Sequence, residues 1–199
     1  MTLASQPLSR RERNKQEKLD RIIAAASELF AERGVEEVTT QQIADQADIG
    51  TGTLFLYAKT KGELLLMVQN THYAEALERG RSAADGVDDV LDAVMAIMEP
   101  IVECNRTQIS NGRTYLRELA FGDPEDPHHA KALTIAGQTE EALADVLRRD
   151  ASLIDDAPTL AHIISAIGLL SMAANADPAV SNAAVAADIR TQVTALLAR

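Results

Sequence analysis

Apolar residues recur at three- and four-residue intervals along most of the 199-residue chain, and no segment alternates as a half-buried strand would. Aromatic residues make up only 3% and Trp is absent, so a core must be built from Leu, Ile, Val, Ala and Met. Such residues, together with abundant Ala and Glu, favour helices over sheets. The sequence therefore predicts an all-α protein.

Start and stop signals divide this pattern into about nine helices. Gly34 is suited to ending the first helix, because the residue past a helix end often needs a positive φ. Thr39 with Gln42 and Thr60 with Glu63 read as capping boxes, in which each side chain satisfies a free N–H at a helix start. The predicted helices span about 11–33, 40–47, 51–57, 61–79, 87–104, 109–121, 127–149, 157–175 and 181–198, with a kink in the fifth at Pro100.

Charge is distributed unevenly along the chain. The net charge is −11, and residues 67–199 hold ten basic and twenty acidic residues, so they account for −10 and residues 1–66 for −1. Residues 1–21 are locally basic, with six basic and three acidic side chains. This asymmetry predicts two domains with different partners, 1–66 and 67–199, the first beginning with a flexible arm over about residues 1–9.

Nothing in the sequence indicates an oxidising compartment or a membrane. Cys104 is the only cysteine, so no disulfide forms within the chain, and a small core residue is favoured over a redox sensor. The first residues lack the apolar core of a signal peptide. The longest apolar stretch, Ile163–Ala174, is judged too short to span a bilayer. We expect a cytoplasmic protein without a membrane partner.

The two short helices, joined by a tight turn over residues 48–50 and packed under the first long helix, form a helix-turn-helix unit. In such a unit the second short helix enters the major groove of DNA, while the first crosses the backbone.

Residues from about Ile22 to Leu65 resemble the DNA-binding domain of the tetracycline-repressor (TetR) family. The matching positions are Phe30, Gly34, Thr39, Ile43, Ala44, Ala47, the run Gly52-Thr53-Leu54-Phe55, Lys61 and Leu64. The sequence departs from the family at Asp48, where Gly is usual, and at Gly50, where Ser is frequent. It departs again at Phe55, where Tyr is usual, and at Ala58, where Phe is usual. The resemblance implies a three-helix DNA-binding domain followed by a C-terminal helical bundle.

Candidate DNA contacts follow from this resemblance and from the exposed positions of the two short helices. Lys61 stands in the first helical turn, where the helix dipole disfavours a cation, which is consistent with a phosphate contact; an ordinary solvated lysine is the alternative. The basic run from Arg10 to Lys18 reads either as an arm in the minor groove or as a frayed helix start. The candidate set is Thr39, Thr40, Gln41, Thr51, Gly52, Thr53, Phe55, Tyr57 and Lys61.

The resemblance also implies partners for the C-terminal region. These are a second copy of the chain, packed through the last two helices, and a small-molecule effector bound among the fourth to eighth helices. Near the expected bend at Pro100, the candidate lining residues are Met95, Met98, Cys104, Tyr115 and Phe121, with Glu99, Glu103 or Glu118 able to favour a cation; a filled core is the alternative. No cofactor and no metal are expected.

Two other function classes were weighed against a DNA-binding regulator. For an enzyme, the only adjacent candidates are His128 and His129, which as helix neighbours do not face one another and read as surface residues. No phosphate-binding glycine loop or nucleophile elbow is present. A structural helical protein would have no use for an exposed Gly-Thr-Leu-Phe helix. The sequence favours a repressor that binds a palindromic operator, with an activator of the same fold as the alternative.

Overall fold

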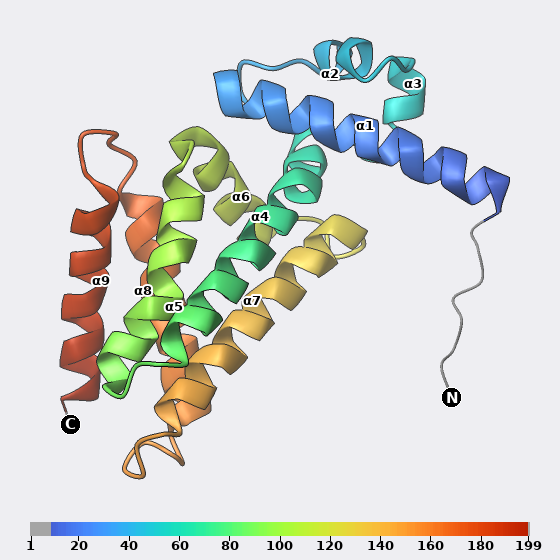
Figure 1. The fold of residues 1–199 in the computed structure, drawn as a ribbon. Helices are drawn as coiled ribbons and strands as arrows, with labels where there is room; N and C mark the ends of the chain where they lie inside the picture. Colours follow the sequence, from blue (N-terminus) through green and yellow to red (C-terminus); the bar gives the residue numbers. More distant parts are fainter. Residues whose placement is uncertain (1–8, 199) are drawn as a thin grey trace, which may run out of the picture.

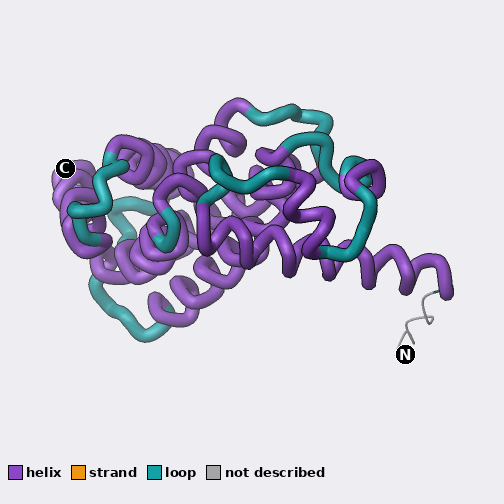
Figure 2. The backbone as a smooth tube through the Cα atoms, turned by 90° about the horizontal axis from the view of Figure 1, so that it is seen from above, coloured by secondary structure: helices purple, strands orange, loops and turns teal. Residues whose placement is uncertain are grey.

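A computed structural model describes residues 9–198, and within this range the chain forms helices and loops without a strand (Figures 1 and 2). The all-α prediction is confirmed, and the arm predicted before residue 9 lies outside the described residues. The nine helices of this range are α1 (Arg10–Arg33), α2 (Thr40–Gln46), α3 (Thr51–Leu54), α4 (Lys61–Ala84), α5 (Val90–Arg106), α6 (Ile109–Phe121), α7 (Pro127–Leu147), α8 (Ala157–Ala174) and α9 (Asn182–Leu197).

The helices form a small head and a larger body (Figure 1). α1 crosses one end of the molecule and carries α2 and α3, while α4 leads from this head into the centre of the body. α4 packs against α5, α6 and α7, and α9 packs against α5 and α8 at the side of the body away from α7. One continuous apolar core runs from Ile22 in α1 to Val193 in α9. The domain boundary expected at residue 66 falls inside α4, so no linker separates head from body.

Most helix ends lie within three residues of their predicted positions. Two differences are larger or functionally relevant: α4 continues to Ala84 instead of ending near residue 79, and α3 ends at Leu54 in a turn rather than at residue 57. α4 continues because Tyr73, Ala76, Leu77 and Gly80 remain on its buried face, so packing stabilises the extra turns.

Of the two predicted capping boxes, one is complete and the other has only one of its two hydrogen bonds. Thr39 and Gln42 form the complete reciprocal box that opens α2. Thr60 accepts from the Glu63 N–H as predicted, but the Glu63 carboxylate accepts from the Lys59 N–H, at 2.5 Å, instead of from Thr60. A third box, Ser9 with Glu12, opens α1 and was missed.

Two features of the body helices bear on their surfaces. α5 runs without interruption through Pro100, so the expected kink does not break the helix. α8 is an 18-residue helix with a mean hydropathy of 1.6, long and apolar enough by length and composition to cross a membrane, contrary to the shorter stretch read from the sequence. Only 39% of it is buried, and Leu170 is 68% exposed, so part of this apolar helix has no cover within residues 9–198.

Arg106 at the end of α5 fixes the connection between α8 and α9. Its buried guanidinium donates to the backbone carbonyls of Asn175, Asp177 and Val180, the last at 2.5 Å, and to Oδ1 of Asn182 at 3.0 Å. A buried cation is tolerated here because its donors are satisfied by oxygen atoms.

Candidate nucleic-acid interface and ligand cavity

The turn between α2 and α3 depends on one residue in the left-handed region. Asp48 has φ 52°, the only positive φ among the non-glycine residues from 9 to 198, and Asp tolerates this conformation better than most side chains. Ile43, Leu54 and Ala58 anchor the turn from within the core. The expectation that Asp48 can replace the usual glycine is therefore confirmed.

α3 is a single helical turn that presents small and apolar side chains. Gly50 precedes it and supplies no side-chain cap, while Gly52 is exposed and Thr53 is half-buried. Phe55 is 46% exposed and the following Leu56 is 83% exposed, although apolar residues of this size are normally covered. Residues 51–57, which comprise α3 and the turn after it, are called the reading head below. The reading head is one part of the head that α1, α2 and α3 form together.

Two candidate contacts are already bonded to each other. The Thr51 hydroxyl donates to Oε1 of Gln41 at 2.7 Å, and the Gln41 amide donates to Asp45 at 2.7 Å. These bonds fix the angle between α2 and α3, and Thr51 does not cap its own helix. The Thr39 side chain is occupied by its capping box, whereas Thr40 makes no side-chain bond of this kind.

Tyr57 joins the reading head to α1. Its hydroxyl donates to the Lys15 carbonyl at 3.3 Å, and its ring is half-buried against the core. Arg21 pairs with Asp48 at 3.5 Å on the same side, an exposed contact of small energetic value. Tyr57 therefore has a structural position in the free chain in addition to its predicted contact with DNA.

Lys61 lies at the start of α4 with its ammonium turned toward the loop between α1 and α2. It donates to the carbonyls of Val35 at 2.9 Å and Glu36 at 3.1 Å. The Lys61 ammonium thus satisfies two backbone carbonyls past the end of α1. Lys61 is therefore not a fully solvated lysine, and its ammonium is not free for phosphate alone. One of its three protons remains for a further acceptor, and the phosphate contact stays a prediction.

The basic run begins as regular helix. Arg10, Arg11, Arg13, Lys15 and Lys18 are exposed on α1, whose start is closed by the Ser9–Glu12 box. Over these residues the chain is exposed helix, and it is not frayed because the capping box satisfies the first free N–H groups. Contact of this basic run along or in the minor groove stays a prediction.

The body contains an apolar cavity of about 280 Å³ bounded by α4, α5, α6, α7 and α8. Met98 and Tyr115 line it, as predicted. Met95 is buried but lies outside the lining, and Cys104 lines a different cleft, between α1 and α4. Phe121 is 86% exposed at the end of α6 and cannot line a cavity in this conformation. Whether Met98 and Tyr115 hold a ligand stays a prediction.

Sequence reasoning missed most of the cavity wall. The missed residues come from five helices that each contribute one face, and periodicity alone does not show which faces meet. They include Tyr73, Ile101, Leu116, Leu119, Ile135, Ser165, Leu169 and Met172. The acidic residue beside the cavity is Glu140, whereas Glu99 and Glu103 line a separate groove and Glu118 pairs with Arg117.

A buried polar network starts at the cavity wall and ends at the reading head. The rings of Tyr73 and Tyr115 are stacked with centroids 4.0 Å apart, and the Tyr115 hydroxyl donates to Asn70 Oδ1 at 3.0 Å. The Asn70 amide donates to the His128 carbonyl at 2.9 Å, and Nε2 of His128 lies 3.3 Å from the Tyr57 carbonyl. Burial raises the pKa of both tyrosines, so both hydroxyls keep their protons.

We call the last of these links the α3–α7 contact. It joins Tyr57, in the turn after α3, to His128 in the first turn of α7. The prediction that His128 and His129 are surface residues was wrong. His128 is half-buried, and His129 is buried with Nε2 3.2 Å from the Leu119 carbonyl.

A second link between head and body, which we call the α1–α6 joint, is formed by Phe30, Gly34, Val35 and Asn111. Buried Asn111 accepts from the Val35 N–H at 2.7 Å and donates to the Phe30 carbonyl at 2.8 Å. Gly34 has φ 77°, and a Cβ there would lie 2.6 Å from the Gln108 and Ser110 side chains. The left-handed backbone requires glycine, and the missing Cβ leaves room for the Gln108 and Ser110 side chains.

The head resembles known proteins in sequence, and the whole chain resembles known proteins in fold. Residues 22–68 match the family model described as "Bacterial regulatory proteins, tetR family". A structure of Thermus thermophilus FadR, a TetR family transcriptional repressor in complex with lauroyl-CoA, aligns with a TM-score of 0.69 at 21% identity. It covers 90% of this chain and 93% of the other. Residues 22–68 therefore match the TetR family model, and the chain as a whole has the fold of this solved TetR regulator.

Three further proteins are similar to all or part of this chain. A TetR transcriptional regulator from Rhodococcus sp. RHA1 aligns over 94% of this chain and 98% of its own, with a TM-score of 0.66 and 17% identity. The fatty acid metabolism regulator protein of Bacillus subtilis is 34% identical over 67 residues, which is 34% of each protein. The HTH-type transcriptional activator FasR of Mycolicibacterium smegmatis is 25% identical over 69% of this chain and 62% of its own. The chain thus matches less than two thirds of either relative.

The single thiol of the chain, that of Cys104, lies beside the α1–α6 joint. Burial raises the pKa of Cys104 to about 11, with nearby Arg79 acting in the opposite direction. A thiol with this pKa is protonated at neutral pH and therefore unreactive. This agrees with the preference for a packing role over a redox sensor.

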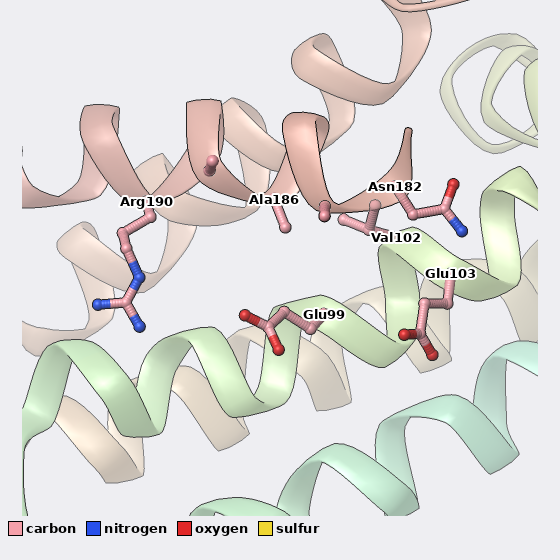
Figure 3. A pocket seen from close by; sticks show the side chains of 8 residues that line it. Glu99, Val102, Glu103, Asn182, Ala186 and Arg190 are labelled. Atoms are coloured by element: carbon pink, nitrogen blue, oxygen red, sulfur yellow. The ribbon is translucent and has the colours of Figure 1, made fainter. Parts of the chain in front are cut away.

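A groove of about 300 Å³ separates α5 from α9 (Figure 3). Glu99 and Glu103 face it from α5, and Asn182 and Arg190 face it from α9. Arg190 pairs with Asp92 at 2.7 Å, so its charge is already engaged. Among residues 9–198 no group of three His, Cys, Asp or Glu side chains has an arrangement that could hold a metal.

Proposed function

We propose that this protein is a cytoplasmic transcriptional repressor that binds a palindromic operator as a homodimer and releases it when a small effector enters the cavity. The observation that carries the proposal is the exposed reading head, linked to the wall of the cavity by one buried and two partly buried hydrogen bonds. Repression is favoured because the structural neighbour from Thermus thermophilus is a repressor, and an activator is the second candidate because the FasR relative is named as one. The family and fold are those of regulators rather than enzymes.

DNA binding is supported by the reading head and the basic start of α1. Small and apolar side chains on α3 suit a major groove, where they read base edges and thymine methyl groups. Basic residues on α1 suit phosphates, which supply affinity without sequence preference.

Selection from random duplex DNA at low salt tests this part of the proposal. We expect an enriched palindrome. Thr53→Ala should change the preferred bases, whereas Thr71→Ala, an exposed threonine on α4, should not. Lys61→Ala should weaken binding to every sequence and reduce its salt dependence, with Lys59→Ala as its matched control. Recovery of no enriched motif would contradict DNA binding.

Dimerisation is supported by apolar residues that the body leaves uncovered. Of the large apolar residues of α8 and α9, Leu160, Ile164, Val185, Ile189 and Val193 face inward. Leu170 is exposed and Ile163, Ile167, Leu196 and Leu197 are half-buried, so these five remain for a partner. Two-fold symmetry would also match two half-sites on one face of DNA.

Sedimentation of purified protein at micromolar concentration tests the dimer. Leu170→Asp should produce monomers, because a carboxylate at an apolar interface is not solvated. Leu133→Asp, at a leucine of α7 that is also partly exposed, should leave the dimer intact. A wild-type monomer would refute this part of the proposal.

Effector control is supported by the polar network. A ligand that displaces Tyr115 or Tyr73 would disturb Asn70, then His128, and then the carbonyl that ends the reading head. Ligand and DNA must weaken each other's binding by the same factor if they prefer different conformers. Titration of a cavity ligand into an operator complex measures that factor, and a factor of one would contradict the proposal.

A further inference from the structure

One polar atom in the wall of the cavity has no hydrogen-bond partner within the described part of the chain, unlike the hydroxyl groups around it. Ser165 Oγ is fully buried and has no hydrogen-bond partner among residues 9–198. Its neighbours in the wall are engaged: the Tyr115 hydroxyl donates to Asn70, and the Thr139 hydroxyl donates to the Ile135 carbonyl at 3.0 Å.

A helical hydroxyl usually bonds to the carbonyl four residues earlier. Thr134, Thr139, Thr191 and Thr194 all do so. Ser165 does not, so its donor and acceptor are both unsatisfied within residues 9–198. Its Oγ is closed off in this conformation, and a rotation about χ1 would bring the hydroxyl to a molecule inside the cavity. A buried polar group without a partner favours binding of any ligand that supplies one.

The charges of the wall restrict what that molecule can be. Apart from its two tyrosines, the only ionisable side chains among the described lining residues are Glu140 and His162, which pair with each other at 3.0 Å, and this lining includes no Lys or Arg. A carboxylate or phosphate inside would face Glu140 without a cation to neutralise it. Burial of such an anion is strongly unfavourable.

The volume of the cavity and the kinds of side chain in its wall restrict the ligand further. The volume of about 280 Å³ is nearly twice the roughly 150 Å³ that encloses one benzene. The stacked Tyr73 and Tyr115 rings offer an aromatic surface, and Met98 and Met172 can adapt to different shapes.

We propose that the cavity takes an uncharged, largely apolar ligand of one or two rings that forms one hydrogen bond with Ser165. This inference rests on the proposed function, in which the cavity holds the effector. It separates this chain from its structural neighbour bound to lauroyl-CoA, since the polyanionic part of such a ligand finds no basic partner at this cavity.

Four probes of known charge test the ligand class on the full chain: 2-naphthylmethanol, naphthalene, 2-naphthoate and lauroyl-CoA. We expect calorimetry at neutral pH to rank the alcohol first, the hydrocarbon about fivefold weaker for want of one hydrogen bond, and both anions at least about tenfold weaker than the alcohol. Equal or tighter binding of either anion overturns the proposal, as does binding of none of the four probes.

Two variants test the role of Ser165. Ser165→Ala should reduce the affinity for the alcohol about fivefold and leave that for naphthalene unchanged. Ser82→Ala, an exposed serine of α4, should alter neither. Equal loss for both ligands, or no loss for the alcohol, overturns the assigned hydrogen bond. Probes that bind as expected but leave operator affinity unchanged support the ligand class and contradict the proposed function instead.

Discussion

The two links between head and body differ in strength. In the α1–α6 joint, Asn111 makes two short bonds to backbone groups in a buried site, and glycine at residue 34 allows α6 to approach closely. In the α3–α7 contact, a half-buried imidazole lies 3.3 Å from one carbonyl. One end of the head is therefore held tightly and the other loosely.

This difference suggests how the head can move without unfolding. A tightly held end acts as a pivot, and displacement accumulates at the loosely held end, as in hinge motions that involve few residues. The loose end is the one that carries the reading head. The polar network from the cavity reaches this end, whereas the α1–α6 joint has its own bonds and does not depend on the network.

The largest expected effect follows from breaking the pivot. Asn111→Ala leaves the buried Val35 N–H without an acceptor and removes one donor from the Phe30 carbonyl. We expect the free energy of unfolding to fall by about 2–3 kcal/mol in urea titrations. Asn14→Ala, at an exposed position of α1, should change it by less than about 0.5 kcal/mol. Equal effects in the two variants would mean that the α1–α6 joint is not tight.

A smaller effect is expected where the network leaves the cavity. Tyr115→Phe removes the donor to Asn70 Oδ1 in a buried site and should cost about 1–2 kcal/mol. Tyr57→Phe removes an equivalent hydroxyl at a half-exposed site and should cost less than about 1 kcal/mol. Urea titration of both variants measures the difference, and a larger loss at Tyr57 would reverse the ranking of the two sites.

Breaking the loose end should affect regulation more than stability. His128→Ala should lower the free energy of unfolding by less than about 1 kcal/mol. It should also reduce the factor by which a cavity ligand weakens operator binding, by about threefold. His72→Ala provides an exposed control on α4. If His128→Ala destabilises the fold as much as Asn111→Ala and leaves the coupling unchanged, the assignment of pivot and loose end is wrong.

The smallest change is expected at Cys104, a natural probe of the pivot. Its raised pKa, about 11, predicts alkylation at pH 8 about 100-fold slower than for an exposed cysteine, with the rate rising as pH approaches 11. If the α1–α6 joint stays closed during regulation, a cavity ligand should leave this rate unchanged. Mass spectrometry of labelled protein tests this, and ligand-dependent labelling would show that the joint opens.

Local signals predicted the fold well. Two helix starts can each be read from a segment of at most four residues, namely Thr39 with Gln42 and Asp126 with Pro127. The structure has a helix beginning at each of these two places. Asp48 was expected to take the left-handed conformation because its own chemistry allows it. Such features depend on few neighbours in the chain, so a sequence displays them directly.

Contacts between distant residues were harder to predict. The dipole argument correctly marked Lys61 as unusual, but its acceptors lie 25 and 26 residues earlier, at Glu36 and Val35. Met95 and Met98 are both apolar residues of α5, yet only Met98 lines the cavity. Residues three apart share one face of a helix, so periodicity alone did not distinguish the two. Asn111, Asn70 and Ser165 lack any sequence pattern, since their roles depend on groups brought together by folding.

Arg106 has a consequence for how this chain can change over evolution. Loops usually tolerate insertions and deletions. The connection from Asn175 to Val180 instead aims three carbonyls at one rigid guanidinium, and Asn182 adds a fourth acceptor from the first turn of α9. Adding or removing one residue would move at least one acceptor away from its donor, and lysine cannot reproduce the planar fork. We therefore expect this connection to keep its length wherever an arginine ends α5, while the turn between α7 and α8 varies freely.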